Sequence, residues 1–112
     1  METRTIPRIS KKKARETPIS RNTLYVSDPE KLHRLAQTLS SPIRLSILYY
    51  VKQHGEISIK ELARLLDISP PIVSRHVRKL EEQGLLVSGI RIGRRGLLKV
   101  LKNRYERIVI EL

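Results

Sequence analysis

The segment 59–86 (IKELARLLDISPPIVSRHVRKLEEQGLL) constrains the fold most, because two short apolar helical patterns stand on either side of a tight break. Ser58 followed by Glu61 is a capping box, which predicts a helix start, and the next two turns carry an apolar stripe. Asp67 stands four positions after the small Ala63, where the chain needs a left-handed turn residue, and Asp tolerates that conformation. A second helix is predicted over about 70–83, with its inward side formed by Val73, Val77 and Leu80.

Two further apolar runs follow this helix pair. Residues 85–90 and 97–101 flank a loop, 91–96, that contains three Arg and two Gly. Such a pattern is typical of a β-hairpin with a charged tip. Two helices joined by a tight turn and followed by a basic hairpin make a winged helix-turn-helix. The sequence therefore predicts a mainly α protein with a small β-hairpin, in the α+β class.

The remaining elements are less sharply marked. Asp28-Pro29 and Ser41-Pro42 each predict a helix start, with the side chain of the first residue as a cap. The apolar residues after Pro42 are too dense for one narrow face, so we expect this helix to be central and largely buried. Residues 57–59 suggest a short strand. Residues 103–112 are ambiguous, since Tyr105, Ile108 and Leu112 fit a helical face whereas 108–110 favour a strand; we expect a short helix.

The net charge of +12 over 112 residues indicates a polyanionic partner, nucleic acid before membrane. We divide the chain into a flexible basic N-terminal arm, 1–27, and a DNA-binding domain, 28–112. The arm is either a solvated tail or a segment that follows DNA phosphates. No Cys is present, and no apolar run is long enough for a membrane span or a signal peptide. We therefore expect a cytoplasmic, nucleoid-associated protein.

Residues 41–48 (SPIRLSIL), Glu61-Leu62-Ala63 and the run 68–86 resemble the ArsR-like branch of winged-helix transcriptional regulators. The resemblance covers about 30–101, and it implies DNA binding more firmly than it implies one individual family. Metal-sensing members carry a Cys pair where this chain has Ser58 and Lys60. They also use Asp and His near the C-terminus, where this chain has only Glu106 and Glu111. We therefore expect neither metal nor arsenic sensing.

The outward side of the second helix predicts the residues that read DNA bases, because a pair of Arg one turn apart can each bind a guanine edge. The candidates for base contact are Pro71, Ile72, Ser74, Arg75 and Arg78. The candidates for the DNA backbone and for the wing are Ser41, Arg44, Ser69, Lys79, Arg91, Arg94 and Arg95. The alternatives are that Arg78 and Lys79 pair with Glu81 or Glu82, and that the charged tip serves only solubility.

One recognition helix reads only a few base pairs, so proteins of this type usually pair. The predicted dimer interface consists of Leu32, Leu35, Leu39, Tyr105, Ile108 and Leu112; the alternative is that these residues form only an intramolecular core. We expect a homodimeric, sequence-specific regulator of transcription that acts as a repressor. The alternatives are a non-specific DNA-coating protein and a winged-helix module that binds RNA or protein.

No nucleophile–base arrangement or cofactor motif is visible, so we expect neither an enzyme nor a cofactor. Few Asn, Gln and Met residues, with abundant Ile, Leu, Arg and Lys, resemble the composition of thermophile proteins, as in an archaeal or viral source.

Overall fold

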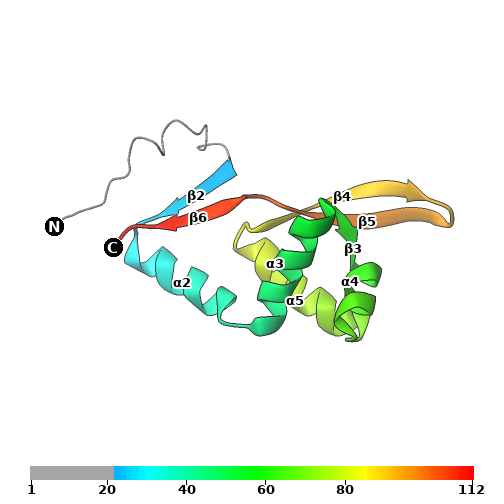
Figure 1. The fold of residues 1–112 in the computed structure, drawn as a ribbon, viewed down its shortest axis with the longest axis horizontal. Coiled ribbons are helices and arrows are strands. Elements are labelled where there is room, and N and C mark those ends of the chain that lie inside the picture. The colour runs from blue at the N-terminus through cyan, green and yellow to red at the C-terminus, as the bar shows by residue number, and fades with distance from the viewer. Residues whose placement is uncertain (1–21) are drawn as a thin grey trace.

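A computed structural model describes residues 22–112. Along the chain its elements are β2 (Thr23–Val26), α2 (Pro29–Leu39), α3 (Pro42–His54), β3 (Ile57–Ser58), α4 (Ile59–Leu66), α5 (Pro70–Glu82), β4 (Leu86–Gly93), β5 (Gly96–Asn103) and β6 (Arg107–Ile110). The helices lie along one side of the molecule, and the strands lie along the other (Figure 1). The described part of the chain is a winged helix-turn-helix of the α+β class, as predicted.

The residues that precede the helices explain where the helices begin. Ser41 and Ser58 have extended backbones, and their hydroxyl oxygens accept hydrogen bonds from the third N–H of the helix that follows, at 3.2 and 3.1 Å. Asp28 and Ser69 occupy the same position before α2 and α5, but neither side chain accepts a capping bond, so the predicted cap at Asp28 is wrong. Pro at the start of α2, α3 and α5 supplies a fixed helical φ where its missing N–H costs nothing.

The turn between α4 and α5 is formed as the sequence predicts. Asp67 has φ 56° and ψ 47°, and it is the only residue other than Gly with positive φ within 22–112. Its N–H and that of Ile68 bond back to the end of α4. Asp67 therefore ends α4 in a left-handed conformation, which directs the chain into α5 after only three residues.

The core lies where α3, α4 and α5 meet the base of the hairpin. Val73, Val77 and Leu80 are fully buried, which confirms the predicted inward side of α5. On α3, Ile47 and Val51 are fully buried, but Leu45 is 50% and Tyr49 57% exposed. The prediction of a largely buried α3 is thus only half correct, because one side of this helix has no neighbour in the described chain.

The predicted hairpin is present, and its strands are longer than expected. β3, β5 and β4 form an antiparallel sheet in that order, and β4 and β5 pair from Leu86↔Asn103 to Gly93↔Gly96. The loop is therefore reduced to Arg94 and Arg95. The hairpin extends well past α4 at one end of the molecule (Figure 1). We call the paired strands β4 and β5, with their turn, the wing.

At the opposite end, β2 and β6 form a parallel two-stranded ribbon in the register Leu24↔Ile108. Bonds from Glu106 N–H to Asn22 O and from Glu111 N–H to Val26 O extend this pairing at both ends. The expected short helix over 103–112 is therefore wrong: β-branched residues at 108–110 find a strand partner some 80 positions earlier in the chain. The boundary of the predicted arm at 27 is wrong as well, since Thr23–Val26 belong to the folded domain. Residues 1–21 lie outside the described residues.

None of the helices within 22–112 is both long enough and apolar enough to span a membrane.

Candidate nucleic-acid interface

The outer side of α5 is polar and basic. With Val73, Val77 and Leu80 buried, the helix exposes Pro71, Arg75, Arg78 and Lys79, and it leaves Ser74 partly exposed. Within the part of the chain that the structure describes, no ion pair involves Arg75, Arg78 or Lys79. The alternative in which Arg78 and Lys79 pair with Glu81 or Glu82 is therefore not realised; Glu81 instead lies 3.8 Å from Lys99 of β5. Three cations along one helix side thus remain available to an anionic partner.

The N-terminus of α5 offers no free backbone donors to an anion. Pro70 and Pro71 lack an N–H, and the N–H groups of Ile72 and Val73 both bond to Ser69 O at 3.1 Å. The Ser69 hydroxyl, in contrast, is exposed and makes no capping bond. A phosphate at this helix end would therefore be bound by side chains rather than by the backbone.

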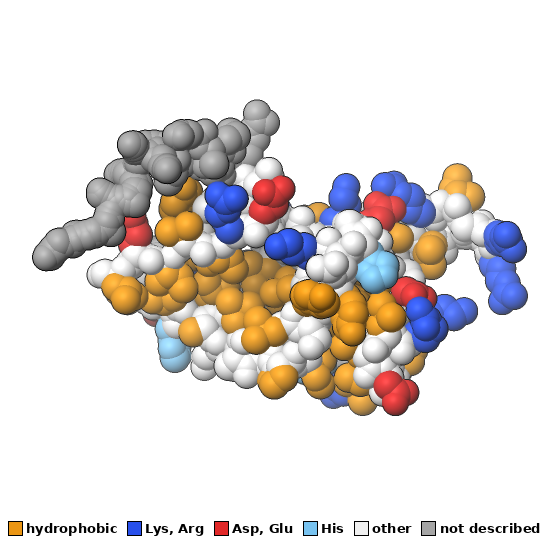
Figure 2. Space-filling view, in the orientation of Figure 1, with side chains coloured by type: hydrophobic (Ala, Val, Ile, Leu, Met, Phe, Trp, Pro, Cys, Tyr) orange, Lys and Arg blue, Asp and Glu red, His pale blue; other side chains and the backbone are white. Residues whose placement is uncertain are grey.

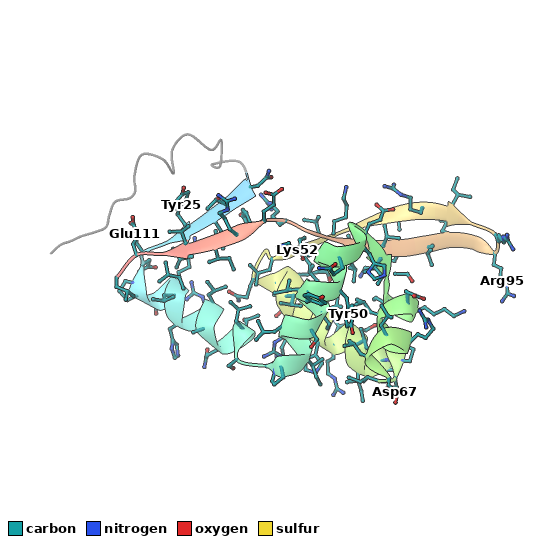
Figure 3. The ribbon with its side chains drawn as sticks, viewed as in Figure 1. Tyr25, Tyr50, Lys52, Asp67, Arg95 and Glu111 are labelled. Carbon is teal, nitrogen blue, oxygen red and sulfur yellow. The ribbon has the colours of Figure 1, made fainter. Side chains whose placement is uncertain are left out.

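The three arginines of the wing differ in their surroundings. Arg91 makes two hydrogen bonds of 2.8 Å to the carboxylate of Glu56, which precedes β3. Arg94 and Arg95 form the exposed turn at the tip, and Arg95 points away from the body of the molecule (Figure 3). Basic side chains gather at this tip, with no acidic one beside them (Figure 2). Two of the three predicted wing cations therefore make no ion pair within 22–112, and the third is held by Glu56.

Arg44 holds α2, α3 and α5 together. Its guanidinium donates to the backbone oxygens of Thr38 at 2.6 Å and Gln37 at 3.3 Å, at the end of α2. It also donates to His76 Nδ1 of α5, at 3.1 Å. An arginine has only donors, so His76 must accept through Nδ1 and carry its proton on Nε2. The sequence predicts Arg44 as a contact to the DNA backbone, whereas here three of its five N–H donors are used within the protein.

The charge of His76 is suppressed by its place beside Arg44. Burial lowers its pKa from the ordinary 6.5, and the nearby positive charges of Arg44, Arg75 and Lys79 lower it further. The imidazole is therefore neutral near pH 7, as its hydrogen bond from Arg44 requires. His33 and His54 lie exposed on their helices.

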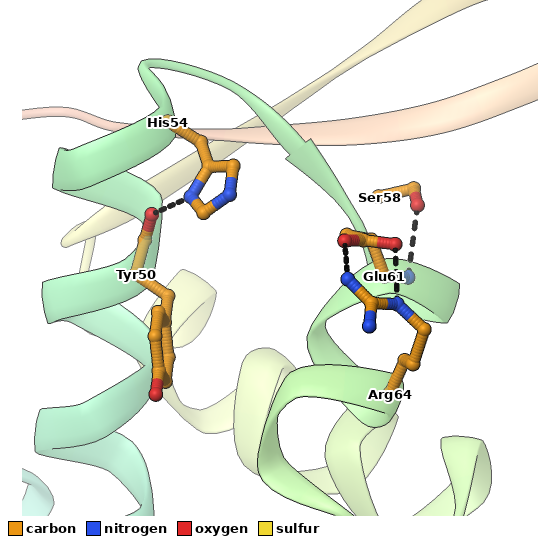
Figure 4. A network of polar contacts seen from close by, with 5 residues as sticks. All are labelled: Tyr50, His54, Ser58, Glu61 and Arg64. Carbon is orange, nitrogen blue, oxygen red and sulfur yellow. Dashed lines mark hydrogen bonds and ion pairs between the residues drawn. The ribbon is translucent and has the colours of Figure 1, made fainter.

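A polar network forms where α3 ends and α4 begins (Figure 4). His54 Nδ1 lies 2.9 Å from the backbone oxygen of Tyr50, and Glu61 pairs with Arg64 one turn later in α4. The hydrogen bond from Arg64 lowers the pKa of the Glu61 carboxyl. The carboxylate is thus used within α4 and does not return to Ser58, so only the hydroxyl half of the predicted capping box is formed.

The predicted dimer residues lie at the ribbon end of the molecule. Leu35 is only 3% exposed in the single chain, and Leu32, Leu39, Tyr105 and Ile108 pack partly buried against the same core. Leu112 is fully exposed. Between α3 and β6 a groove of about 310 Å³ is lined by the apolar side chains of Leu45, Leu48, Tyr49, Leu85, Tyr105 and Ile108. Leu35 is too buried to contact a partner chain. Leu45 and Tyr49 are exposed and could contact one, although they were not among the predicted dimer residues.

No group of three or more His, Asp or Glu side chains close enough to hold a metal ion occurs within 22–112.

Sequence reasoning missed several partners. Glu56 and His76 hold Arg91 and Arg44, and nothing in their local pattern indicates this, because the partners are 35 and 32 positions away. It also missed the most exposed large aliphatic side chains of the wing, Ile92 and Leu97. Their exposure could have been predicted from the sequence, because large apolar residues beside a basic turn at the tip of a hairpin are too far from the core to be buried in it.

Residues 41–88 match the model of the family described as bacterial regulatory protein, arsR family. This match runs from the cap of α3 into β4 and includes the whole helix-turn-helix. An HTH-type transcriptional regulator of Methanocaldococcus jannaschii is 40% identical over 57 residues, which are 51% of this chain and 59% of that protein. The HTH-type transcriptional repressor CsqR of Escherichia coli is 40% identical over 52 residues, which are 46% of this chain and 20% of that protein. The chain thus spans less than two thirds of these curated relatives.

Among solved structures, the homodimeric winged helix-turn-helix DNA-binding domain from Mycobacterium bovis superposes with a TM-score of 0.60 at 22% identity. The superposition covers 70% of this chain and 68% of the chain from Mycobacterium bovis. This likeness shows the fold. Together the comparisons show a winged helix-turn-helix fold, in which residues 41–88 are similar to the arsR family.

Proposed function

We propose that this chain is a DNA-binding transcriptional regulator of the arsR family that represses by occupying a promoter as a homodimer. In this proposal α5 enters the major groove, and the tip of the wing lies along the backbone or in the adjacent minor groove. The observation that carries it is a row of cations on the outer side of α5, Arg75, Arg78 and Lys79, which make no ion pair within residues 22–112. Together with α4, this helix forms a helix-turn-helix. The names of the similar regulators agree with it.

Each exposed side chain then has a role that follows from its chemistry. Arg75 and Arg78 bind guanine edges, since a guanidinium donates two parallel hydrogen bonds to O6 and N7. Pro71, Ile72 and Ser74 lie beside them and contact bases through methylene groups or a hydroxyl. Lys79 and the Ser69 hydroxyl bind phosphates, because neither has a partner within the described residues.

Ser41 and Arg44 have different roles in this proposal. The Ser41 oxygen already accepts the N–H of Arg44, and its hydroxyl proton is free to bind a phosphate. Arg44 is a positioning residue: its bonds to the end of α2 and to His76 fix α5 relative to the remainder of the domain. We therefore expect it to affect DNA binding through the placement of α5.

The homodimer is proposed to form at the ribbon end, around the groove between α3 and β6. Leu112 is an exposed apolar residue at this end, and Leu45 and Tyr49 of α3 are exposed on the groove. Partly buried side chains that retain some surface are Leu32, Leu39, Tyr105 and Ile108. This end is remote from the wing tip, so two copies joined there leave both recognition helices free (Figure 1). The homodimeric domain from Mycobacterium bovis is consistent with such an assembly.

The test begins with selection of bound duplexes from a random pool by the wild-type protein, followed by gel shifts on the selected site. We expect Arg75→Ala to relax base preference, and Arg94→Ala with Arg95→Ala to weaken binding to every duplex and to flatten its salt dependence. Lys31→Ala removes an exposed cation from α2 that does not line the groove between α3 and β6, and it is the matched control, with unchanged binding expected. Unchanged affinity in all of these variants would refute the assignment.

The same measurements separate the alternatives. A specificity ratio near unity between the selected site and unrelated duplex would indicate a DNA-coating protein. Strong binding to structured RNA without binding to duplex DNA would indicate an RNA-binding module. Size exclusion tests the dimer: elution as a 13.0 kDa species at micromolar concentration would contradict it.

A further inference from the structure

The outer half of the wing has one apolar side. In an antiparallel pair, directly opposed residues lie on the same side of the sheet. Leu86 and Leu101 are buried against the core, and the same side continues outward through Ile90, opposite Lys99, to Ile92, opposite Leu97. Beyond the body of the domain this side has no helix beneath it (Figure 1). The core side of the hairpin therefore becomes an exposed apolar surface near its tip.

Exposure on this surface is extreme for such side chains. Ile92 is 87% and Leu97 76% exposed, and the two form a cross-strand pair directly next to the turn. Single exposed aliphatic residues are common, but two of them paired at the end of a projecting hairpin form a blunt apolar ridge. Neither side chain contributes to the core, so the domain gains no stability from their size.

The charges around this ridge indicate what it contacts. Residues 83–105 contain six Lys or Arg and no Asp or Glu. Arg94 and Arg95 follow the Ile92–Leu97 pair after only the Gly93–Gly96 pair, and they make no ion pair in the described chain. Arg91 is on the other side of the hairpin and is held by Glu56. An apolar ridge with free cations at its end, and no acid along the hairpin, fits a polyanion that also presents flat apolar surfaces.

The minor groove of duplex DNA is such a partner, because phosphates line it and the faces of stacked bases become accessible when a step is opened. We propose that Ile92 and Leu97 form an apolar wedge that enters the minor groove beside the site read by α5, so that the wing bends the duplex. Arg94 and Arg95 hold the phosphates on either side of the opened step. This inference rests on the proposed DNA binding of α5, to which it adds a deformation of the DNA.

The wedge also gives the protein a preference for certain DNA sequences at base steps to which it makes no hydrogen bond. Pyrimidine–purine steps such as TA and CA/TG unstack most easily, so the wedge favours them. The selected sites are therefore expected to be enriched in these steps beyond the bases contacted by α5. The enrichment is expected to disappear when the pool is selected with the Ile92→Ser/Leu97→Ser double variant.

The decisive measurement is the bend of a duplex of about 30 base pairs carrying the selected site, from energy transfer between dyes at its two ends at saturating protein. The wild-type protein is expected to raise the transfer. The double variant Ile92→Ser/Leu97→Ser is expected to bind the same site while losing most of the increase. Both side chains are exposed, so its thermal unfolding is expected to match that of the wild type. Leu98→Ser, at a 41% exposed position on the other side of the same hairpin, opposite Arg91, is the matched control and is expected to bend DNA normally.

Each other result has a definite meaning. A wild-type complex that leaves the duplex straight, or a double variant that bends it fully, would overturn the wedge while the proposed DNA binding stands. A double variant that becomes monomeric on size exclusion would show that the ridge binds a second copy, which also overturns it. Absence of any duplex binding by the wild type would instead refute the proposed function itself.

Discussion

The two ends of the molecule use apolar residues in opposite ways. At the ribbon end, Val26 of β2 and the neighbouring Leu35 of α2 are buried in one core, although the ribbon pairs segments from the two ends of the described chain. At the wing end, Ile92 and Leu97 are exposed, and nearby Arg94 and Arg95 make no ion pair in the described part of the chain. Burial explains the apolar residues of the first end. Those of the second have no use within the single domain, which is why we assign them to a partner.

The largest effect is expected from breaking the ribbon end. Val26→Asp places a carboxylate in the core without a partner, and we expect it to lower the free energy of unfolding by about 3 kcal/mol or more. Tyr25→Asp changes the adjacent, exposed residue of the same strand and is expected to cost about 1 kcal/mol or less. Urea unfolding measures both values. Equal losses would mean that the ribbon is not an integral part of the core.

The second prediction concerns the connection between the two ends. Arg44→Met keeps the length of the side chain but removes the donors to Thr38 O, Gln37 O and His76, and we expect a loss of about 1–2 kcal/mol in the free energy of unfolding. Arg34→Met, at an exposed position of α2, is the control and is expected to be neutral. An Arg44 that contacted phosphate instead would give the reverse pattern, with unchanged stability and a flatter salt dependence of DNA binding.

The third prediction compares two arginines of the wing. Arg94→Ala is expected to reduce the slope of log affinity against log salt by about 0.9, the value for one phosphate contact. Arg91→Ala is expected to change the slope little, because Glu56 already neutralises that guanidinium. Gel shifts over a salt series measure both. If the two variants flattened the slope equally, the ion pair with Glu56 would not keep Arg91 from the DNA.

The helix-turn-helix and the ribbon also differ in how far they could be predicted from the sequence. The helix-turn-helix and the wing were predictable because their signals are local: the caps at Ser41 and Ser58, the left-handed Asp67, and the inward residues of α5. The ribbon was not, because the strand tendency of 108–110 competes with a helical spacing until β2 is available as a partner. Among the site residues, the sequence shows which cations face outward on α5. It does not show that Arg44 and Arg91 have acceptors more than 30 residues away in the sequence.

The smallest effect is expected from His76, which lies between the core and the basic side of α5. Because burial and the charges of Arg44, Arg75 and Lys79 lower its pKa below the ordinary 6.5, the unfolded chain binds a proton more readily than the folded one. Its contribution to stability is therefore complete above the ordinary pKa and is lost as the pH falls through the lowered pKa. The urea midpoint of the wild type is expected to fall between about pH 8 and pH 5 more steeply than that of His76→Asn, whose side-chain oxygen still accepts from Arg44. His33→Asn, at an exposed position, is expected to keep the wild-type pH dependence, and an identical profile for His76→Asn would show that His76 does not titrate as its surroundings require.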